Sequence, residues 1–302
     1  MEQDFRIEDL KSFLERGLGW GLSSLSPVRG HVTWSLNYKA VRATDDLPFL
    51  VKLTPDTGEE FQRRFDNLTK HLSVLSGSKA EQQLFPDGPS AYGHYRIRFL
   101  SWCPGVRIQP DRLSPAELAQ FAEDYLQFSD AMSKTSVMLP EMDGASLVRE
   151  VKAGCRGFWG RLIRRTIERE MPMADVVHRP ELLRPIHGDF HYGNFHFENG
   201  RVSGFFDLED IRKGYPTEDV VRYFVCTAEH LRWYALHRHV ALLRAFRRMV
   251  GLLPYSAHEW KVAVNLYFLH KARRRVGRGW TKQASLWARN FFYRKLKDSA
   301  AC

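Results

Sequence analysis

The chain has 302 residues, which is long enough for one large or two modest domains, and its 44% hydrophobic and 26% charged residues are ordinary for a globular protein. No apolar run approaches the ~20 residues that cross a bilayer, and the N-terminus lacks the basic and apolar opening of a signal peptide. The four cysteines are scattered without a Cys-x-x-Cys pair, which argues against a zinc site or a disulfide framework and predicts a protein of the reducing cytoplasm.

The net charge of +10 is unevenly distributed along the chain. Residues 220–302 contain 17 Lys and Arg but only three acidic residues, whereas residues 1–219 contain 28 Lys and Arg and 32 Asp and Glu. Such an excess indicates either solvated helix faces or a surface for an anionic partner, such as an acidic substrate, a membrane surface or nucleic acid. No nucleic-acid-binding motif accompanies it, so we expect no nucleic acid partner.

The N-terminal third of the chain predicts a sheet accompanied by two helices. Apolar residues at helical spacing predict the helices, over residues 5–17 and about 58–75. Runs rich in β-branched and aromatic residues predict the strands, over residues 35–41, 49–53 and 92–100.

Helices dominate from Ser114 onward. Ser114 is followed three residues later by Glu117, a pairing that is typical of a helix N-terminus. Long helices return from about Thr217, which resembles a second N-cap. Between these helical regions, Asn199-Gly200 separates two short apolar runs. Both residues tolerate the positive φ of a tight turn, so the sequence predicts a β-hairpin here.

Polar residues with ligand and base chemistry flank this predicted hairpin. Asp189 and Asn194 lie five residues apart before it, and Asp207 follows its second apolar run. A hairpin folds the chain back, so we expect Asp207 to return close to Asn194. Carboxylate and amide oxygens suit a hard cation such as Mg²⁺, and Asp189 remains free to accept a proton. The sequence therefore predicts a phosphoryl-transfer site that uses MgATP.

The string His187-Gly188-Asp189-x-x-x-x-Asn194, followed by Asp207-x-Glu209-Asp210, resembles the motifs of the aminoglycoside phosphotransferase/choline kinase-like family. These enzymes are small-molecule relatives of protein kinases. The resemblance implies an α+β, bilobal protein-kinase-like fold. It implies a small sheet-rich, nucleotide-binding lobe at residues 1–100 and a larger helical lobe at 101–302 that carries the catalytic loop and the acceptor site.

The resemblance also implies roles for the matched residues. Asp189 is implied as the catalytic base, and His191 as a catalytic-loop residue whose role is open. Asn194 and Asp207 are implied as magnesium ligands. Asp219, twelve residues beyond Asp207, matches an acidic residue that braces the catalytic loop.

In the same family the nucleotide phosphates are held from the N-terminal side. Lys52 closes an apolar run and matches the strand lysine that contacts the α- and β-phosphates. We expect its acidic partner on the following helix and choose Glu60, with Glu59 and Asp66 as alternatives. Glu209 either contacts a second magnesium ion or is exposed.

Two further segments complete the implied nucleotide site. In the phosphate-covering loop that precedes Lys52, Ser35 and Asn37 could donate to phosphate oxygens, although an ordinary β-turn is the alternative. The run that contains Leu100 and Trp102 matches the hinge whose backbone meets the adenine.

The predicted reaction is transfer of the γ-phosphoryl group of ATP or GTP to a hydroxyl group of a small molecule. The basic C-terminal region favours a neutral or anionic acceptor, such as a sugar or a sugar phosphate, and a pocket lined by carboxylates would count against this expectation. The basic run 271–275 and the aromatic stretch 280–293 would also suit an anionic membrane surface. Two alternatives stay open: phosphorylation of protein hydroxyls, and a degenerate kinase fold that only binds.

Overall fold

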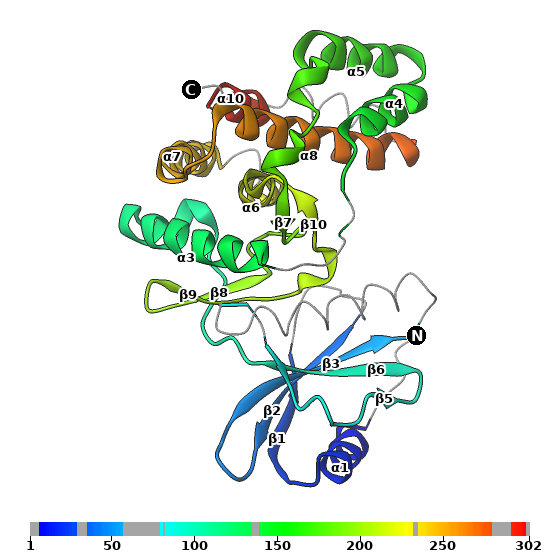
Figure 1. The fold of residues 1–302 in the computed structure, drawn as a ribbon, viewed down its shortest axis with the longest axis vertical. Helices are drawn as coiled ribbons and strands as arrows, with labels where there is room; N and C mark the ends of the chain where they lie inside the picture. The colour runs from blue at the N-terminus through cyan, green and yellow to red at the C-terminus, as the bar shows by residue number, and fades with distance from the viewer. Residues whose placement is uncertain are drawn as a thin grey trace. The chain divides into compact units, whose positions relative to one another are not determined.

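The computed structural model describes residues 6–28, 35–56, 79–80, 82–134, 139, 141–231, 235–279 and 291–299. These residues form two compact units. Unit 1 contains the described residues up to Pro104 together with Gly204–Glu209, and unit 2 contains those of Gly105–Ser203 and Asp210–Cys302. Figure 1 shows an antiparallel sheet in the first part of the chain and mostly helices in the later part. This arrangement confirms the predicted α+β architecture.

Unit 1 is an antiparallel sheet with one described helix. Its strands pair in the order β1-β2-β3-β6-β4, and β5 pairs with β6. The elements are α1 (Ile7–Leu18), β1 (Leu22–Pro27), β2 (Leu36–Arg42), β3 (Pro48–Pro55), β4 (Gln83–Leu84), β5 (Ala91–Tyr92) and β6 (Tyr95–Ser101). The helix predicted over 5–17 and the strands predicted over 35–41, 49–53 and 92–100 are therefore confirmed. The helix predicted over 58–75 lies outside the described residues.

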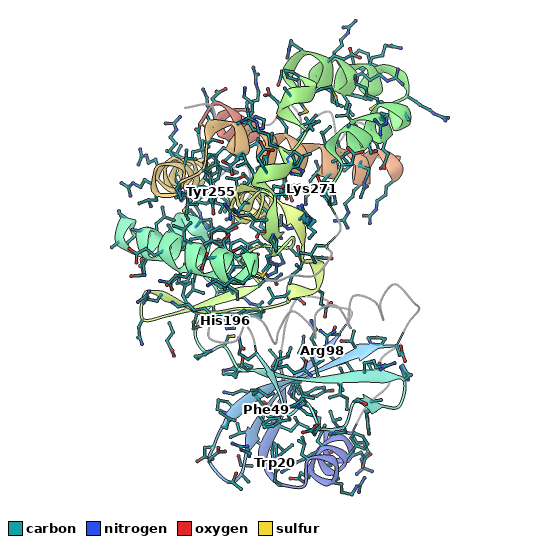
Figure 2. All side chains as sticks on the ribbon, in the orientation of Figure 1. Trp20, Phe49, Arg98, His196, Tyr255 and Lys271 are labelled. Carbon is teal, nitrogen blue, oxygen red and sulfur yellow. The ribbon has the colours of Figure 1, made fainter. Side chains whose placement is uncertain are left out.

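The core of unit 1 explains how β3 is oriented. Phe49, Val51 and Leu53 alternate along β3 and are fully buried. They join Leu10 and Leu14 from α1 in one apolar cluster. The Trp20 and Phe49 rings meet edge to face, with centroids 5.9 Å apart (Figure 2). Because side chains alternate along a strand, Lys52, which lies between Val51 and Leu53, faces away from this core.

Unit 2 consists mainly of helices and carries two small strand pairs, and two of the elements named below, β9 and η4, lie partly in the Gly204–Glu209 segment of unit 1. The strands are β7 (Arg184–Ile186), which pairs antiparallel with β10 (Arg212–Gly214), and β8 (Phe195–Glu198), which pairs with β9 (Arg201–Phe205). Its α-helices are α3 (Pro115–Ser133), α4 (Gly144–Gly154), α5 (Gly157–Glu170), α6 (Pro216–His230), α7 (Leu236–Leu252), α8 (Ala257–Gly277) and α10 (Phe291–Ser299). Short 3₁₀ turns are η1 (Pro110–Arg112), η2 (Met173–Asp175), η3 (Pro180–Leu182) and η4 (Leu208–Asp210). Among the described helices, none combines the length and the apolar composition needed to cross a lipid bilayer.

The helix N-termini test two sequence predictions. The Ser114 hydroxyl accepts a hydrogen bond from the Glu117 amide, and the Glu117 carboxylate accepts one from the Ser114 amide, which confirms the capping box of α3. The predicted cap at Thr217 is wrong, because α6 already begins at Pro216. Proline favours the first helical position, and the Thr217 hydroxyl instead donates to the Glu259 carbonyl at 3.0 Å.

A cluster of buried aromatic side chains forms the centre of unit 2. The Phe121 ring on α3 lies 6.1 Å from that of Phe190, 5.4 Å from that of Phe195 and 5.2 Å from that of Tyr223 on α6, measured between centroids. Phe190 itself is fully buried. The segment that contains Phe190 is therefore packed between α3 and α6, and its polar neighbours in the sequence are held by that packing.

Candidate active site

The hairpin β8–β9 forms where Asn199-Gly200 predicts it. Asn199 has a φ of 52° and Gly200 a φ of 77°, so both turn residues adopt the left-handed backbone that the prediction requires. The buried Asp124 carboxylate on α3 accepts hydrogen bonds from the Val202 amide and the Arg201 guanidinium, each at 2.9 Å. Asn194 immediately precedes β8 and belongs to unit 2, whereas Asp207 follows β9 and belongs to unit 1.

The loop before the hairpin is fixed by a single buried carboxylate. Asp219 on α6 accepts hydrogen bonds from the His187 amide at 2.8 Å and from the Gly188 amide at 2.9 Å. Burial raises the pKa of the Asp219 carboxyl, although His187 and the two amide donors act in the opposite direction. The predicted bracing role of Asp219 is therefore confirmed.

Gly188 is required by the geometry of this loop. Its φ is 78°, and a Cβ atom at this position would lie 2.0 Å from the Asp210 carbonyl oxygen. Any other residue would combine an unfavourable backbone conformation with a steric clash. The glycine thus lets the segment before Asp189 pass close to the backbone that follows Asp207.

The structure brings together Asp189, His191 and Asn194. The Asn194 side-chain amide donates to the Asp189 carbonyl at 2.9 Å. The His191 Nε2 atom lies 3.7 Å from the Asp189 Oδ2 atom, and the His191 Nδ1 atom accepts a hydrogen bond from the Gly193 amide at 3.0 Å. The other carboxylate oxygen of Asp189, Oδ1, accepts a hydrogen bond from the guanidinium of Arg222.

Arg222 is a candidate site residue that the sequence prediction missed. It lies on α6 three residues after Asp219, so that both side chains lie on one helix face. Burial lowers the pKa of the Arg222 guanidinium, but the charge of Asp189 and the nearby Cys226 and Tyr267 outweigh it and raise the pKa overall. The spacing Asp219-x-x-Arg222 next to a predicted catalytic loop was the available signal.

In unit 1 the structure joins Lys52 to Asp207. The Lys52 ammonium donates to the Asp207 Oδ1 atom at 2.7 Å and forms an ion pair of the same length with the Glu209 Oε1 atom. Lys52 is only 7% exposed. The choice of Glu60 as its partner, and the alternatives Glu59 and Asp66, lie outside the described residues.

Asp207 has an unusual backbone that is suited to a functional residue. Its φ is 64°, a left-handed conformation that costs an L-residue about 1 kcal/mol or more, though less for aspartate than for most residues. Its side chain is 36% exposed. The structure therefore holds a carboxylate at a specific angle while leaving it accessible to a ligand.

Two residues carry the ligand chemistry that a hard divalent cation prefers, one in each unit. The Asp207 carboxylate in unit 1 is 36% exposed, and the Asn194 side chain in unit 2 has an amide oxygen besides the nitrogen that donates to Asp189. Within the described ranges, no group of three or more His, Cys, Asp or Glu side chains is arranged to hold a metal ion. Mg²⁺ in nucleotide sites commonly binds one or two protein ligands together with phosphate oxygens and water, so few protein ligands are needed.

The remaining predicted nucleotide residues lie in or beside the sheet of unit 1. Asn37 is opposite Lys52 in the β2–β3 register, and its Oδ1 atom is buried without a hydrogen-bond partner in the described part of the chain. The Ser35 hydroxyl lies 3.4 Å from that of Thr54. Leu100 is fully buried in β6, and the Lys39 ammonium lies over the Trp102 ring, 4.7 Å from its centroid. The loop residues 29–34 lie outside the described residues.

A pocket of about 280 Å³ lies in unit 2. Three carboxylates and two guanidinium groups line it, with smaller and apolar residues between them. The lining residues are Glu141, Met142, Asp143, Ser146, Leu147, Glu150, Arg212 and Arg273. The lining carries both signs of charge and includes no residue of the predicted catalytic loop, so the expectation of a neutral or anionic acceptor stays a prediction.

The basic C-terminal region is also partly neutralised by acidic residues from earlier in the chain. Arg238 pairs with Asp111 at 2.6 Å, Lys261 with Asp175 at 3.3 Å, and Arg273 with Glu150 at 3.3 Å. Within the region itself, Lys271, labelled in Figure 2, pairs with Glu229 at 2.8 Å. The three pairs with earlier residues reduce the positive field that the sequence count suggests. Residues 280–290 of the predicted aromatic stretch lie outside the described residues, so the membrane surface stays a prediction.

A comparison with family models agrees with the sequence motifs. The model of the phosphotransferase enzyme family matches residues 33–252, a range that includes Lys52, Asp189, Asn194 and Asp207. No curated protein matches the chain.

Several solved structures share the fold at low sequence identity. The gentamicin complex of APH(2″)-IIa has a TM-score of 0.63 at 14% identity and covers 96% of each chain. Amicoumacin kinase in complex with AMP-PNP, Ca²⁺ and Ami has a TM-score of 0.58 at 11% identity, covering 97% of this chain and 96% of the other. Macrolide 2′-phosphotransferase MphH from Brachybacterium faecium has a TM-score of 0.60 at 11% identity, covering 94% and 98%. These likenesses confirm the predicted fold class.

Proposed function

We propose that this chain, which belongs to the phosphotransferase enzyme family, transfers the γ-phosphoryl group of ATP or GTP to a hydroxyl group of a small molecule. The hydrogen bond of 2.7 Å between Lys52 and Asp207 carries the proposal. These residues are 155 positions apart in the sequence, and the family resemblance assigns both of them to one nucleotide site. Phosphoryl transfer needs a phosphate-binding cation next to a metal-binding carboxylate, and this pair supplies both.

Unit 1 residues are assigned to the nucleotide in this proposal. Lys52 holds the α- and β-phosphates, and the sheet-rich lobe at residues 1–100 receives the purine near Leu100 and Trp102. Asp207 and Asn194 would hold Mg²⁺, which when bound neutralises charge on the phosphate oxygens. The complex of amicoumacin kinase with AMP-PNP and Ca²⁺ supports a nucleotide and a divalent cation as ligands of this fold.

The catalytic loop in the lobe at residues 101–302 is assigned to the acceptor. The Asp189 Oδ2 atom orients the acceptor hydroxyl and takes its proton, while the hydroxyl oxygen forms the new bond to the γ-phosphorus. The bond between the γ-phosphorus and the bridging oxygen breaks, and the nucleoside diphosphate leaves. His191, 3.7 Å from the same carboxylate oxygen, is placed to contact the acceptor. Most of the rate comes from positioning and charge neutralisation.

The acceptor is proposed as a polar, hydroxyl-bearing small molecule without a fixed charge sign. The mixed carboxylate and guanidinium lining of the unit 2 pocket suits polar groups of either sign. The structural neighbours include a complex with gentamicin, a macrolide 2′-phosphotransferase and an amicoumacin kinase complex with Ami, which makes such compounds the first ones to test.

The proposal is tested by a screen for phosphorylated products. The purified chain is incubated with Mg²⁺ and either ATP or GTP, together with single aminoglycosides, macrolides, sugars, choline or a generic protein substrate. We expect nucleoside diphosphate release and a phosphorylated product with at least one small molecule. The Asp189→Ala variant should stay folded by circular dichroism and lose roughly 10²- to 10⁴-fold in turnover. Wild-type turnover in that variant would refute the assignment of the base.

A further inference from the structure

Two cations are buried side by side in the sheet of unit 1. Lys52 on β3 lies directly opposite Arg98 on β6 in the antiparallel register, so both side chains project from the same face. Lys52 is 7% exposed and Arg98, labelled in Figure 2, is 2% exposed. Like charges at opposite positions repel each other, and buried charges are costly without a counter-charge. This face of the sheet therefore requires nearby anions.

The segment Asp207–Glu209 supplies such anions. Its Asp207 and Glu209 carboxylates each lie 2.7 Å from the Lys52 ammonium, and the Glu209 Oε1 atom lies 4.0 Å from the Arg98 guanidinium. The chain just before the segment is fixed to unit 1 as well, because the Phe205 amide donates to the Lys79 carbonyl at 2.7 Å. Two carboxylates thus face two cations.

The Asp207 and Glu209 carboxylates differ in their exposure to solvent and in their neighbours. Asp207 is the more exposed, at 36% of its side chain against 24% for Glu209. Glu209 is also near Arg98, whose side chain is only 1% exposed. If Asp207 turns toward a metal ion and the phosphates, Lys52 keeps Glu209 as a counter-charge. The charge of Arg98, 4.0 Å from Glu209, favours the same position of that carboxylate.

We propose that Glu209 is a positioning residue for Lys52: together with Arg98, it holds the ammonium in the phosphate-binding position while Asp207 binds the metal. The inference rests on the proposed function, because it assigns Lys52 to a nucleotide phosphate. It differs from the two earlier readings of Glu209, as a ligand of a second magnesium ion or as an exposed residue. It also supplies an acidic partner for Lys52 from the Asp207-x-Glu209 motif itself.

The test is a double-mutant cycle on ATP binding. Isothermal titration calorimetry measures the ATP dissociation constant in EDTA and in Mg²⁺ for the full chain, Glu209→Gln, Lys52→Met and the double variant. Glu209→Gln should weaken ATP binding about tenfold in both media, because the ammonium then shifts toward Asp207. In the Lys52→Met background the same change should alter binding by less than about twofold.

Other results would overturn the proposal. A metal ligand would show its effect in Mg²⁺ alone and would keep it in the Lys52→Met background, and additive effects in EDTA would exclude coupling to Lys52. Asp207→Asn is the matched control, and its effect on ATP binding should be larger in Mg²⁺ than in EDTA, unlike that of Glu209→Gln. A Glu60→Gln variant with the larger coupling to Lys52 would transfer the positioning role to residue 60.

A readout without nucleotide separates this inference from the proposed function. If the unmodified chain binds neither ATP nor GTP, the proposed function fails, but the charge arrangement is still testable by unfolding. Glu209→Gln should lower the thermal midpoint because two buried cations then share one carboxylate of the segment. Adding Arg98→Met should recover part of the loss, and an unchanged midpoint in Glu209→Gln would overturn the inference on its own.

Discussion

The two units hold their candidate functional groups by different physical means. In unit 1, Lys52 is held by side-chain carboxylates, at 2.7 Å from both Asp207 and Glu209. In unit 2, the loop before Asp189 is held through its backbone, because the amides of His187 and Gly188 both donate to Asp219. Side-chain ion pairs can be exchanged for phosphate or metal, whereas a backbone brace stays in place whatever is bound.

The two carboxylates that hold these groups, Asp219 and Asp207, also differ in their exposure to solvent. The Asp219 carboxylate is 1% exposed, whereas the Asp207 side chain is 36% exposed. A buried carboxylate that satisfies two amides contributes to folding, whereas a carboxylate that is partly exposed and has a second carboxylate beside it contributes less. We therefore expect equivalent substitutions in the two units to separate stability from ligand binding.

The largest expected effect comes from the same substitution made in each unit. Asp219→Asn places an amide nitrogen against a backbone N–H, so it loses one strong hydrogen bond and leaves a buried donor unpaired. We expect a loss of about 3 kcal/mol in the free energy of unfolding, measured by urea denaturation. Asp207→Asn should cost less than about 1 kcal/mol, because Asn tolerates the left-handed backbone and the buried Lys52 ammonium keeps the Glu209 carboxylate as a counter-charge.

This pair of variants tests the comparison directly. Equal losses of stability in the two variants would show that Asp207 is also a structural brace. A stable Asp219→Asn variant with a normal denaturant midpoint would show that the loop is held by its aromatic packing around Phe190 instead.

A second expected effect concerns His270 in unit 2, whose imidazole lies near several arginines. Burial, together with Arg222 on α6, Arg273 and Arg274 on α8 and Arg212 on β10, lowers the pKa of His270 to about 4. The unfolded chain takes up this proton near its ordinary pKa of 6.5, whereas the folded chain resists it until about pH 4. Stability from His270 is therefore complete above pH 6.5 and falls as the pH drops from 6.5 toward 4.

The measurement is the pH dependence of unfolding. Between pH 7.5 and pH 4.5 the His270 term should remove roughly 2 kcal/mol of stability, and His270→Gln should flatten the profile by that amount. His237→Gln on α7 is the control, since His237 is exposed and the profile should keep its slope. An unchanged slope in His270→Gln would mean that the imidazole is not held neutral by its surroundings.

The sequence could predict the elements that depend on local spacing. Asn199-Gly200 specified its hairpin because only a few residues tolerate two successive positive φ angles, and Ser114 with Glu117 specified a capping box. The order of the motifs along the chain assigned Lys52 and Asp207 to one site, but their direct contact was not predicted. Thr217 failed as a cap because Pro216 takes the first helical position one residue earlier.

Long-range pairing was beyond what the sequence could predict. The contact of Arg98 with the Asp207-x-Glu209 segment depends on the β3–β6 register, which no local pattern encodes. The count of basic residues after position 219 misled for the same reason, because Arg238 and Lys261 find their carboxylates at Asp111 and Asp175. The net charge of a sequence segment therefore does not give the charge around it in the folded protein, because acidic residues from other segments pair with its cations.

The smallest expected effect concerns the ion pair of Arg222 with Asp189, because here unit 2 also holds a functional group by a side-chain charge, as unit 1 holds Lys52. Arg222 forms a side-chain ion pair with Asp189, so that one carboxylate oxygen is fixed and the other is left for the acceptor. Arg222→Met should let the carboxylate rotate and lower kcat about tenfold, with little change in the KM for nucleotide, because only the alignment of the base is affected.

Arg222→Lys keeps the charge but loses the planar guanidinium, so it should recover part of the rate and serves as the matched variant. Steady-state kinetics with the best acceptor from the screen give both constants, and the thermal midpoint checks folding. A rise in the KM for the acceptor at constant kcat would instead make Arg222 a binding residue for the acceptor. In that case the ion pair with Asp189 would be a contact that the acceptor displaces, and unit 2 would use an exchangeable charge pair just as unit 1 does with Lys52.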